Sequence, residues 1–280
     1  MSFRFDRIAT LYLVNPIRRS VLGNKPAIPI LMYHSIADES ETGMQAYYRT
    51  TTTPSMFALH MKHLSDHGYS TISVADAVSL LQYGSLTRKC AVITFDDGYG
   101  DFYRHAFPIL SRYRFSATVF LPTAYIGTQP IQFKGKDCLT WSEIRELRTH
   151  GISFGSHTVT HPQLSTLDAN SVKNEIINSK RAIEDNIGES VDAFAYPYAF
   201  PEANVSFVQM LRDTLIDAGY QQGVSTRIGV ARAQEDPFFL RRLPMNSRDD
   251  IPLFDAKLQG GYDWLHSVQY ASKFIRAKAS

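Results

Sequence analysis

A short apolar run that ends in two aspartates constrains the fold of this chain most. Residues 90–95 (Cys-Ala-Val-Ile-Thr-Phe) are apolar or β-branched and do not alternate with polar residues. That pattern is typical of a strand buried on both faces of a parallel sheet. Asp96 and Asp97 follow directly. Because an unpaired buried charge is costly, we expect both carboxylates to emerge at the carboxyl end of the strand, where parallel α/β folds bind ligands.

Two adjacent carboxylates repel each other, so the pKa of one rises unless a cation intervenes. A divalent metal would resolve the conflict, with one aspartate as its ligand and the other free to act as a base. The structural alternative is that Asp97 caps the next helix and Asp96 is a surface charge. The Asp-Asp-Gly sequence alone favours this alternative, and a second group of metal-binding residues is needed to favour the metal.

Composition places the chain among ordinary globular α/β proteins. Its 280 residues include 44% hydrophobic and 20% charged residues, which supports a sizeable core and argues against disorder. A net charge of +2 does not favour nucleic-acid binding, and two cysteines do not make a disulfide framework. We expect no transmembrane segment and a cytoplasmic location. Residues 1–25 are expected to be a packed or frayed arm, with an amphipathic membrane-surface segment as the alternative.

Predicted strands and helices alternate along the chain. Strands are expected at residues 28–33, 70–72, 89–95, 116–121, 152–156, 193–196, 220–224 and 238–243, and helices at 54–68, 74–83, 99–113, 141–150, 168–186, 202–218 and 249–258. This alternation predicts parallel βα units in a barrel or a doubly wound sheet. Residues 37–53 lack a period and are expected to form a loop. We predict one domain at 28–260, between an arm at 1–27 and a tail at 261–280.

A second polar group follows the strand predicted at 152–156. His157 and His161 are spaced i, i+4, but Pro162 disfavours the helical conformation at His161. We therefore expect a loop at the carboxyl end of this strand, at the same edge of the sheet as the two aspartates. Either histidine alone is better explained as a capping or surface residue. Together with one carboxylate, they predict a three-ligand metal site with open positions for water and substrate.

These two motifs resemble those of the polysaccharide deacetylases, the NodB homology family of carbohydrate esterases (family 4). The resemblance rests on Thr94-Phe95-Asp96-Asp97-Gly98-Tyr99 and Ser156-His157-Thr158-Val159-Thr160-His161, with weaker support from Leu139-Thr140-Trp141 and Phe194-Ala195-Tyr196-Pro197-Tyr198. It runs in the expected order from about residue 28 to about residue 258. It implies a distorted (β/α) barrel with fewer than the usual eight strands and a metal-dependent removal of N- or O-acetyl groups from sugars.

The resemblance also implies a role for each matching polar residue. Asp96 would be the general base, and Asp97 would ligate the metal together with His157 and His161. Two imidazoles and one carboxylate suit Zn²⁺, and Co²⁺, Ni²⁺ or Fe²⁺ fit the same donors.

Further positions would serve the substrate. Tyr198, which follows Pro197, would offer its backbone N–H to the oxyanion. Trp141 matches a family position that lines the groove, and Tyr99 and Tyr198 could stack on a sugar ring.

The chain departs from the family pattern beside the base. Ala195 stands where the family often has an arginine, two residues before Pro197. Arg242 could replace that arginine as the partner of Asp96. Arg241 is the competing choice, and strand alternation puts the two side chains on opposite faces.

A second departure concerns the general acid. A C-terminal Leu-x-His motif, its usual source in the family, is not evident, because Trp264-Leu265-His266 lies in a polar tail without a strand pattern. Leu31-Met32-Tyr33-His34-Ser35 instead resembles the branch that deacetylates poly-N-acetylglucosamine, in which such a histidine supplies the acid. His34 is therefore the candidate acid, and a core or capping histidine is the alternative.

We expect a hydrolase that releases acetate from the N-acetyl group of an amino sugar in a polysaccharide or glycan precursor. Hydrolysis of a non-sugar amide or imide is an alternative, because the chemistry at the carbonyl is the same. A carbohydrate-binding protein that has lost catalysis is the alternative from another class. A pure binder need not keep a base beside a metal site, which counts against it.

Overall fold

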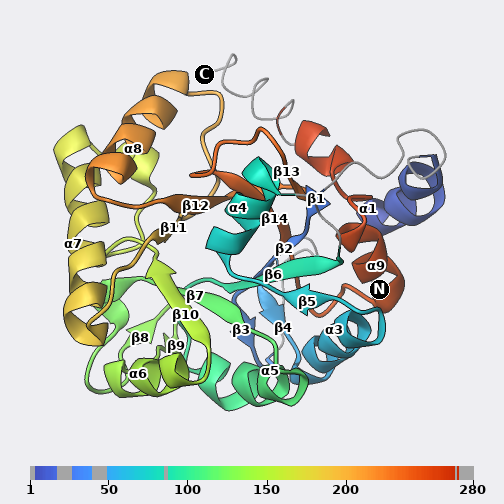
Figure 1. The fold of residues 1–280 in the computed structure, drawn as a ribbon, viewed down its shortest axis with the longest axis horizontal. Coiled ribbons are helices and arrows are strands. Elements are labelled where there is room, and N and C mark those ends of the chain that lie inside the picture. Colours follow the sequence, from blue (N-terminus) through green and yellow to red (C-terminus); the bar gives the residue numbers. More distant parts are fainter. Residues whose placement is uncertain (1–3, 18–26, 40–48, 85–87, 269, 271–280) are drawn as a thin grey trace.

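Seven parallel strands close into a barrel at the centre of the computed structural model, which describes residues 4–17, 27–39, 49–84, 88–268 and 270 (Figure 1). The order around the barrel is β2 (Ile30–Tyr33), β14 (Leu240–Pro244), β12 (Gln222–Ile228), β11 (Ala193–Ala195), β10 (Ile152–Ser156), β7 (Ala117–Leu121) and β6 (Cys90–Phe95), and β6 pairs again with β2. β5 (Ser70–Thr71) adds to the sheet beside β6. The expected distorted (β/α) barrel with fewer than eight strands is confirmed.

Short strand pairs decorate the barrel. β1 (Ala27–Ile28) pairs antiparallel with β13 (Ala231–Arg232), and β8 (Gln132–Phe133) pairs antiparallel with β9 (Lys136–Asp137). β3 (Ser35–Ile36) pairs with β4 (Thr51–Thr52), so the segment expected to be a loop at 37–53 contains a strand. The polar composition of that segment hid it, because a two-residue strand has no period.

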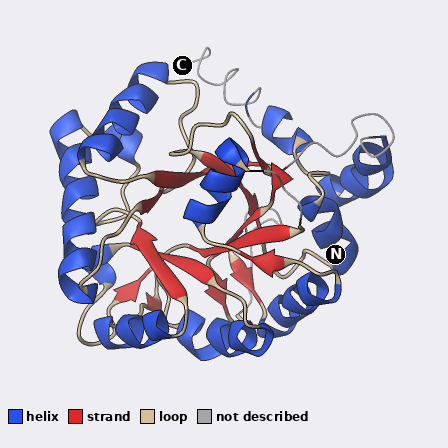
Figure 2. Ribbon diagram, in the orientation of Figure 1, coloured by secondary structure: helices blue, strands red, loops and turns tan. Residues whose placement is uncertain are grey.

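Helices surround the barrel in Figure 2, with red strands inside and blue helices outside, except for one helix that lies over the middle of the barrel. They are α3 (Pro54–Asp66), α4 (Val74–Tyr83), α5 (Phe107–Tyr113), α6 (Trp141–Thr149), α7 (Ala169–Ile187), α8 (Val205–Asp217) and α9 (Ile251–Leu258). The helix expected at 99–113 begins later, as the π-helical turn η3 (Phe102–Ala106) that continues into α5. The starts of α4 and α6 follow the sequence signal, since Ser73 and Thr140 each form a capping box with the acid three residues on.

Two hydrophobic clusters fill the molecule. The larger one lies between the strands and the outer helices, and the smaller one fills the barrel. Val74, Ala77 and Leu81 of α4 belong to the smaller cluster, together with Cys90 and Leu240 at the beginnings of β6 and β14. α4 therefore plugs the amino end of the barrel and leaves the carboxyl end for polar side chains.

The arm at the amino end is helical where it is described. α1 (Phe5–Ile8) continues into the π-helical segment η1 (Ala9–Val14), which packs against α9. Within the described residues, no helix combines the length and the apolar character that crossing a bilayer requires.

Candidate active site

The two aspartates lie where β6 ends, at the carboxyl end of the barrel. Both are buried, with exposed fractions of 2% for Asp96 and 3% for Asp97. Inward-facing residues alternate along β6, so Asp96 follows Val92 and Thr94 into the barrel. Asp97 and Gly98 both have a positive φ (70° and 60°), so the chain turns sharply and aims Asp97 away from Asp96. The adjacent carboxylates thereby acquire different partners.

Asp96 is held by a buried arginine from β14, which is separated from β6 by β2 alone. Arg242 of β14 donates from Nη1 to Asp96 Oδ1 and from Nη2 to Asp96 Oδ2, both at 2.7 Å. It also donates to Thr94 Oγ1 and to the carbonyl of Ser225. Burial would raise the pKa of Asp96, but the charge and hydrogen bonds of Arg242, together with the nearby His157 and His34, outweigh burial and hold that pKa below its usual value. Asp96 is therefore an ionised carboxylate.

The choice between the two neighbouring arginines is decided by strand alternation. Arg242 is fully buried inside the barrel, whereas Arg241 points outward and lies 3.5 Å from Glu235. The guanidinium beside Asp96 thus comes from β14, as the sequence alternation allowed.

His157 and His161 lie on the loop that follows β10. His161 has φ 56°, so the loop is not a helical turn, as the following proline predicted. Glu175 of α7 fixes the loop, because its carboxylate accepts from the N–H groups of Val159 and Thr160 at 2.8 and 2.9 Å. A contact with α7 therefore fixes the loop between the two histidines.

Asp97, His157 and His161 converge on one point. One ligand atom from each lies within 4.8 Å of the others. Asp97 Oδ1 is 3.2 Å from His161 Nε2 and 3.7 Å from His157 Nε2, yet it has no hydrogen-bond partner among the described residues. A buried carboxylate oxygen that lacks a partner and faces two imidazole nitrogens fits a divalent cation well. The three residues therefore form a candidate metal site.

The protonation of the imidazoles also suits a metal. His157 Nδ1 lies 2.8 Å from the carbonyl of Ala195, so this nitrogen carries the proton and Nε2 presents its lone pair toward Asp97. Burial lowers the pKa of His157 to about 4, which keeps the ring neutral. Burial acts in the opposite direction on Asp97, but the surrounding imidazoles and Lys134 hold its pKa far below the usual value.

Two residues support the outer oxygen of Asp97. The hydroxyl of Tyr99 donates to Asp97 Oδ2 at 2.9 Å, and Lys134 Nζ lies 3.3 Å from the same oxygen. The Lys134 ammonium also lies over the rings of Phe133 and Tyr198, at 4.5 and 5.5 Å from their centres. Sequence analysis missed Lys134, because the β8–β9 hairpin that carries it has no motif.

His34 lies beside Asp96, at the end of β2. Its Nε2 is 4.0 Å from Asp96 Oδ2, and its Nδ1 is buried without a hydrogen-bond partner in the described structure. Burial lowers the pKa of His34. The structure thus brings His34 to the site. His266, the other histidine considered as an acid, lies 2.8 Å from Glu202.

The turn after β11 brings Tyr198 over the histidines. Tyr198 has φ 58°, and its ring, which is 49% exposed, packs edge-on against His161 with the ring centres 4.7 Å apart. One hydroxyl holds the turn. Thr226 Oγ1 donates to the Tyr198 carbonyl at 2.7 Å and accepts from the Phe200 N–H at 3.0 Å. Thr226 therefore fixes the orientation of the two peptide groups that follow Tyr198, on either side of Ala199.

Two aromatic residues expected to face a sugar are buried instead. Tyr99 uses its hydroxyl on Asp97 and is 5% exposed, and Trp141 belongs to the hydrophobic core as the first residue of α6. Neither residue presents an open ring face, so their burial does not agree with the expectation that they stack on a sugar. Pro197 is also buried, between β11 and Tyr198.

Backbone strain gathers at this end of the barrel. Within the described chain, seven residues other than glycine have a positive φ, and five of them are Asp97, Lys134, Thr158, His161 and Tyr198. A β-branched residue such as Thr158 pays most for this conformation. Such strain persists where the surrounding structure enforces it, and it concentrates at functional sites.

Comparison with known proteins agrees with this geometry. Residues 83–222 match the family model described as polysaccharide deacetylase. YxkH of Bacillus subtilis (strain 168), which is named as a polysaccharide deacetylase, is 34% identical over 237 residues, covering 84% of this chain and 77% of YxkH. The poly-β-1,6-N-acetyl-D-glucosamine N-deacetylase of Escherichia coli (strain K12) is 31% identical over 156 residues, which cover 50% of this chain but 22% of that protein.

A solved structure shares the architecture. The Streptococcus pyogenes deacetylase PplD, in complex with acetate, superposes with a TM-score of 0.72 and 26% identity, covering 84% of this chain and 99% of that one. The family match includes the strand that carries Asp96 and Asp97 and the loop that carries both histidines. A parallel barrel with this polar end, and relatives over most of its length, lead to one conclusion: the chain belongs to the polysaccharide deacetylase family.

Proposed function

We propose that this protein is a metal-dependent deacetylase that hydrolyses the N-acetyl group of an amino sugar in a polysaccharide or glycan precursor. One observation carries the proposal. An ionised carboxylate, Asp96, lies beside the converging ligand atoms of Asp97, His157 and His161. A base next to a candidate metal site suits the attack of water on an acetamide.

Asp97, His157 and His161 would hold the ion, and Zn²⁺ suits these donors best, with Co²⁺, Ni²⁺ and Fe²⁺ as alternatives. When bound, such an ion supplies Lewis-acid polarisation of the acetyl carbonyl. The Tyr99 hydroxyl and Lys134 keep Asp97 ionised and oriented toward the histidines.

Asp96 would take a proton from the attacking water. Its ion pair with Arg242 fixes the carboxylate and keeps it free of protons before the step. The bond that forms joins the water oxygen to the acetyl carbon. Among the described residues, the ionisable nitrogens within 4.0 Å of the Asp96 carboxylate oxygens belong to Arg242, His34 and His157.

Tyr198 and His34 would complete the reaction. The Tyr198 N–H, in a turn fixed by Thr226, would donate to the developing oxyanion. His34, whose Nε2 lies 4.0 Å from Asp96 Oδ2, would take the water proton from Asp96 and pass it to the sugar nitrogen as the bond to the acetyl carbon breaks. The products are acetate and a free amino sugar. The exposed Tyr198 ring would contact the sugar.

Acetate release from poly-β-1,6-N-acetylglucosamine oligomers tests the proposal, with metal content measured on the same preparation. Small cyclic amides and imides serve as comparison substrates. We expect acetate and free amine from the oligomers and no opening of the cyclic compounds. Turnover of the cyclic compounds alone would favour the non-sugar amidase. Bound metal with no turnover of any acetylated glycan would favour a binding protein. The cytoplasmic location stays a prediction, with a position at the membrane surface as the alternative.

A further inference from the structure

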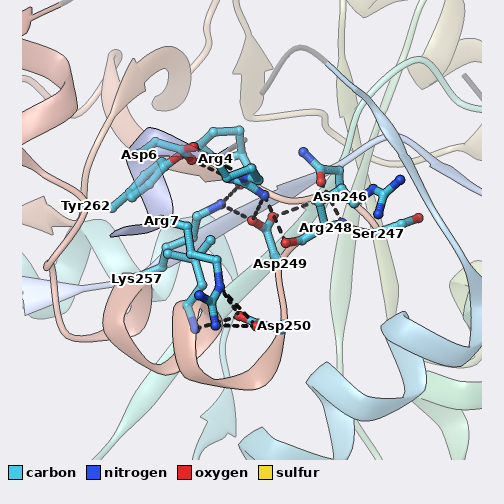
Figure 3. Close-up of polar contacts among 12 residues, drawn as sticks. Arg4, Asp6, Arg7, Asn246, Ser247, Arg248, Asp249, Asp250, Lys257 and Tyr262 are labelled. Atoms are coloured by element: carbon cyan, nitrogen blue, oxygen red, sulfur yellow. Dashed lines mark hydrogen bonds and ion pairs between the residues drawn. The ribbon is translucent and has the colours of Figure 1, made fainter. Parts of the chain in front are cut away.

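The helical arm is attached to the body through charged residues. Arg4 donates to the carbonyl of Arg248 at 2.9 Å and to Asp249 Oδ1 at 3.3 Å, and it pairs closely with Asp6 (Figure 3). Asp6 in turn accepts from the Tyr262 hydroxyl at 2.6 Å. These contacts are largely shielded from solvent, so the first turn of the arm faces the body with its polar side.

The attachment continues along the arm. Arg7 pairs with Asp250 at 2.6 Å, and Trp264 donates from Nε1 to Thr10 Oγ1 at 3.0 Å. Asn15 lies so close to the turn after α9 that a Cβ on Gly261 would come within 2.9 Å of its Oδ1. Polar side chains thus turn inward over the length of the arm, and this fixes which side faces solvent.

The opposite side of the arm is apolar and exposed. We call it the arm face, and it comprises Phe5 (65% exposed), Ile8 (37%), Tyr12 (69%), Leu13 (57%) and Ile17 (63%). A surface helix of a globular protein normally turns its apolar stripe toward the core, so this helix is amphipathic in the reverse sense. Monomeric proteins rarely expose a contiguous apolar surface without a binding function.

The charge of the surrounding sequence indicates what the arm face contacts. Residues 1–25 contain five basic residues and one acidic residue, Asp6, and the segment 264–280 contains three basic residues and no acidic one. Trp264, which begins that second segment, contacts the arm directly. The chain as a whole has a net charge of only +2, so positive charge is concentrated in these two segments. An apolar helix face with basic flanks matches a bilayer that contains anionic lipid.

We propose that the arm face is a membrane-docking surface that lies in the interface of an anionic bilayer. The apolar side chains enter the boundary between head groups and acyl chains, and the ion pairs of the inner side keep the barrel fixed to the docked helix. The surface is separate from the metal ligands, so this inference does not depend on the proposed function. Docking would bring the barrel to substrates at a membrane.

Vesicle co-sedimentation of the full chain tests the surface. One probe is vesicles of phosphatidylcholine alone, and the other is vesicles of phosphatidylcholine and phosphatidylglycerol in equal amounts. We expect binding to the anionic vesicles, weaker binding to the neutral ones, and loss of binding at high salt. The double variant Tyr12→Ser/Leu13→Ser removes two exposed side chains of the arm face and should lower the partition coefficient at least roughly tenfold.

The matched control is Tyr83→Ser/Val205→Ser, which removes two apolar side chains that are 88% and 75% exposed on α4 and α8. It should bind vesicles as the unchanged chain does. Thermal unfolding checks that both variants fold, and acetate release from short soluble oligomers should be unchanged in both. The proposal is wrong if the unchanged chain ignores both kinds of vesicle, or if both double variants lose binding equally. A dimer in solution that only the arm variant dissociates would assign the face to a second copy and would also overturn it.

Discussion

Two clusters of buried charged residues in this molecule differ in how fully their polar atoms are paired. In the arm cluster (Arg4, Asp6, Asp249, Lys257 and Tyr262; Figure 3), both oxygens of Asp249 are used: Oδ1 by Arg4 and Lys257, and Oδ2 by the N–H of Asn246. In the cluster at the carboxyl end of the barrel, three buried atoms have no partner among the described residues: Asp97 Oδ1, His34 Nδ1 and His161 Nδ1.

From this contrast we infer that the arm cluster stabilises the fold, whereas the cluster at the carboxyl end of the barrel is arranged to bind a ligand. Unpaired buried polar atoms are costly, so a fold tolerates them where something else satisfies them. Strained backbone gathers at the same end of the barrel, whereas none of the five arm-cluster residues has a positive φ. His60 joins the two clusters, because it contacts the carbonyl of Asp249 and the hydroxyl of Tyr33, the residue before His34.

The largest expected effect is on catalysis. Asp96→Asn should keep the metal and lower kcat by roughly 10²–10⁴-fold, because it removes the proposed base and leaves Asp97 and both histidines in place. Metal analysis beside acetate release measures both properties. His157→Ala is the comparison variant and should lose metal and activity together. A fully active Asp96→Asn protein would exclude the mechanism.

Asp249→Ala should produce the largest loss of stability. It leaves the Lys257 ammonium, which is 1% exposed, without its carboxylate, and breaking a buried pair from one side costs about 3–5 kcal/mol. Urea unfolding at neutral pH gives the change. Asp66→Ala, which breaks the exposed pair with Lys62, is the control and should leave the midpoint almost unchanged. Equal effects from both variants would contradict the importance of the buried pair.

His60 should make stability depend on pH. Burial lowers its pKa to about 4 in the folded state, below the usual value of 6.5. At neutral pH the ring is neutral in both states. As the pH falls from about 6.5 toward 4, the unfolded chain binds a proton that the folded chain does not, so stability falls.

This loss should be roughly 2 kcal/mol between pH 7 and pH 5. Unfolding of the unchanged chain and of His60→Gln at both pH values isolates the contribution of His60. An identical pH dependence in the two proteins would show that the ring titrates normally in the folded state.

The smallest effect concerns the turn that presents Tyr198. Thr226→Val removes the hydroxyl that bonds the Tyr198 carbonyl and the Phe200 N–H. Because about two hydrogen bonds are lost, we expect kcat to fall roughly tenfold with little change in KM. Thr226→Ser keeps the hydroxyl and should restore kcat. If the valine and serine variants behave alike, Thr226 has only a packing role.

The parts of the molecule that local sequence patterns determine were predictable. The apolar run before Asp96 indicated a barrel strand, and Pro162 indicated that His161 lies in a loop. The helices predicted to begin at residues 74 and 141 do begin there, directly after the capping residues Ser73 and Thr140. In each case the cause lies within a few residues of the effect.

The missed features depend on distant contacts. Glu175 clamps the histidine loop from 15 and 16 residues away, and Thr226 fixes Tyr198 across 28 residues. Tyr99 looked available for a sugar, but a tertiary contact buries it. The arm was expected to pack or fray, and only its ion pairs with Asp249 and Asp250 show that its polar side faces inward.

The order of strands around the barrel has a consequence for synthesis. β2, one of the first strands to leave the ribosome, pairs with β14, the last strand in the described part of the chain, so the ring stays open until residues 240–244 have emerged. Asp96 must likewise wait for Arg242, which lies 146 residues later. A nascent chain without β14 therefore lacks the arginine that pairs with Asp96, and the enzyme should gain activity only after this strand has been synthesised.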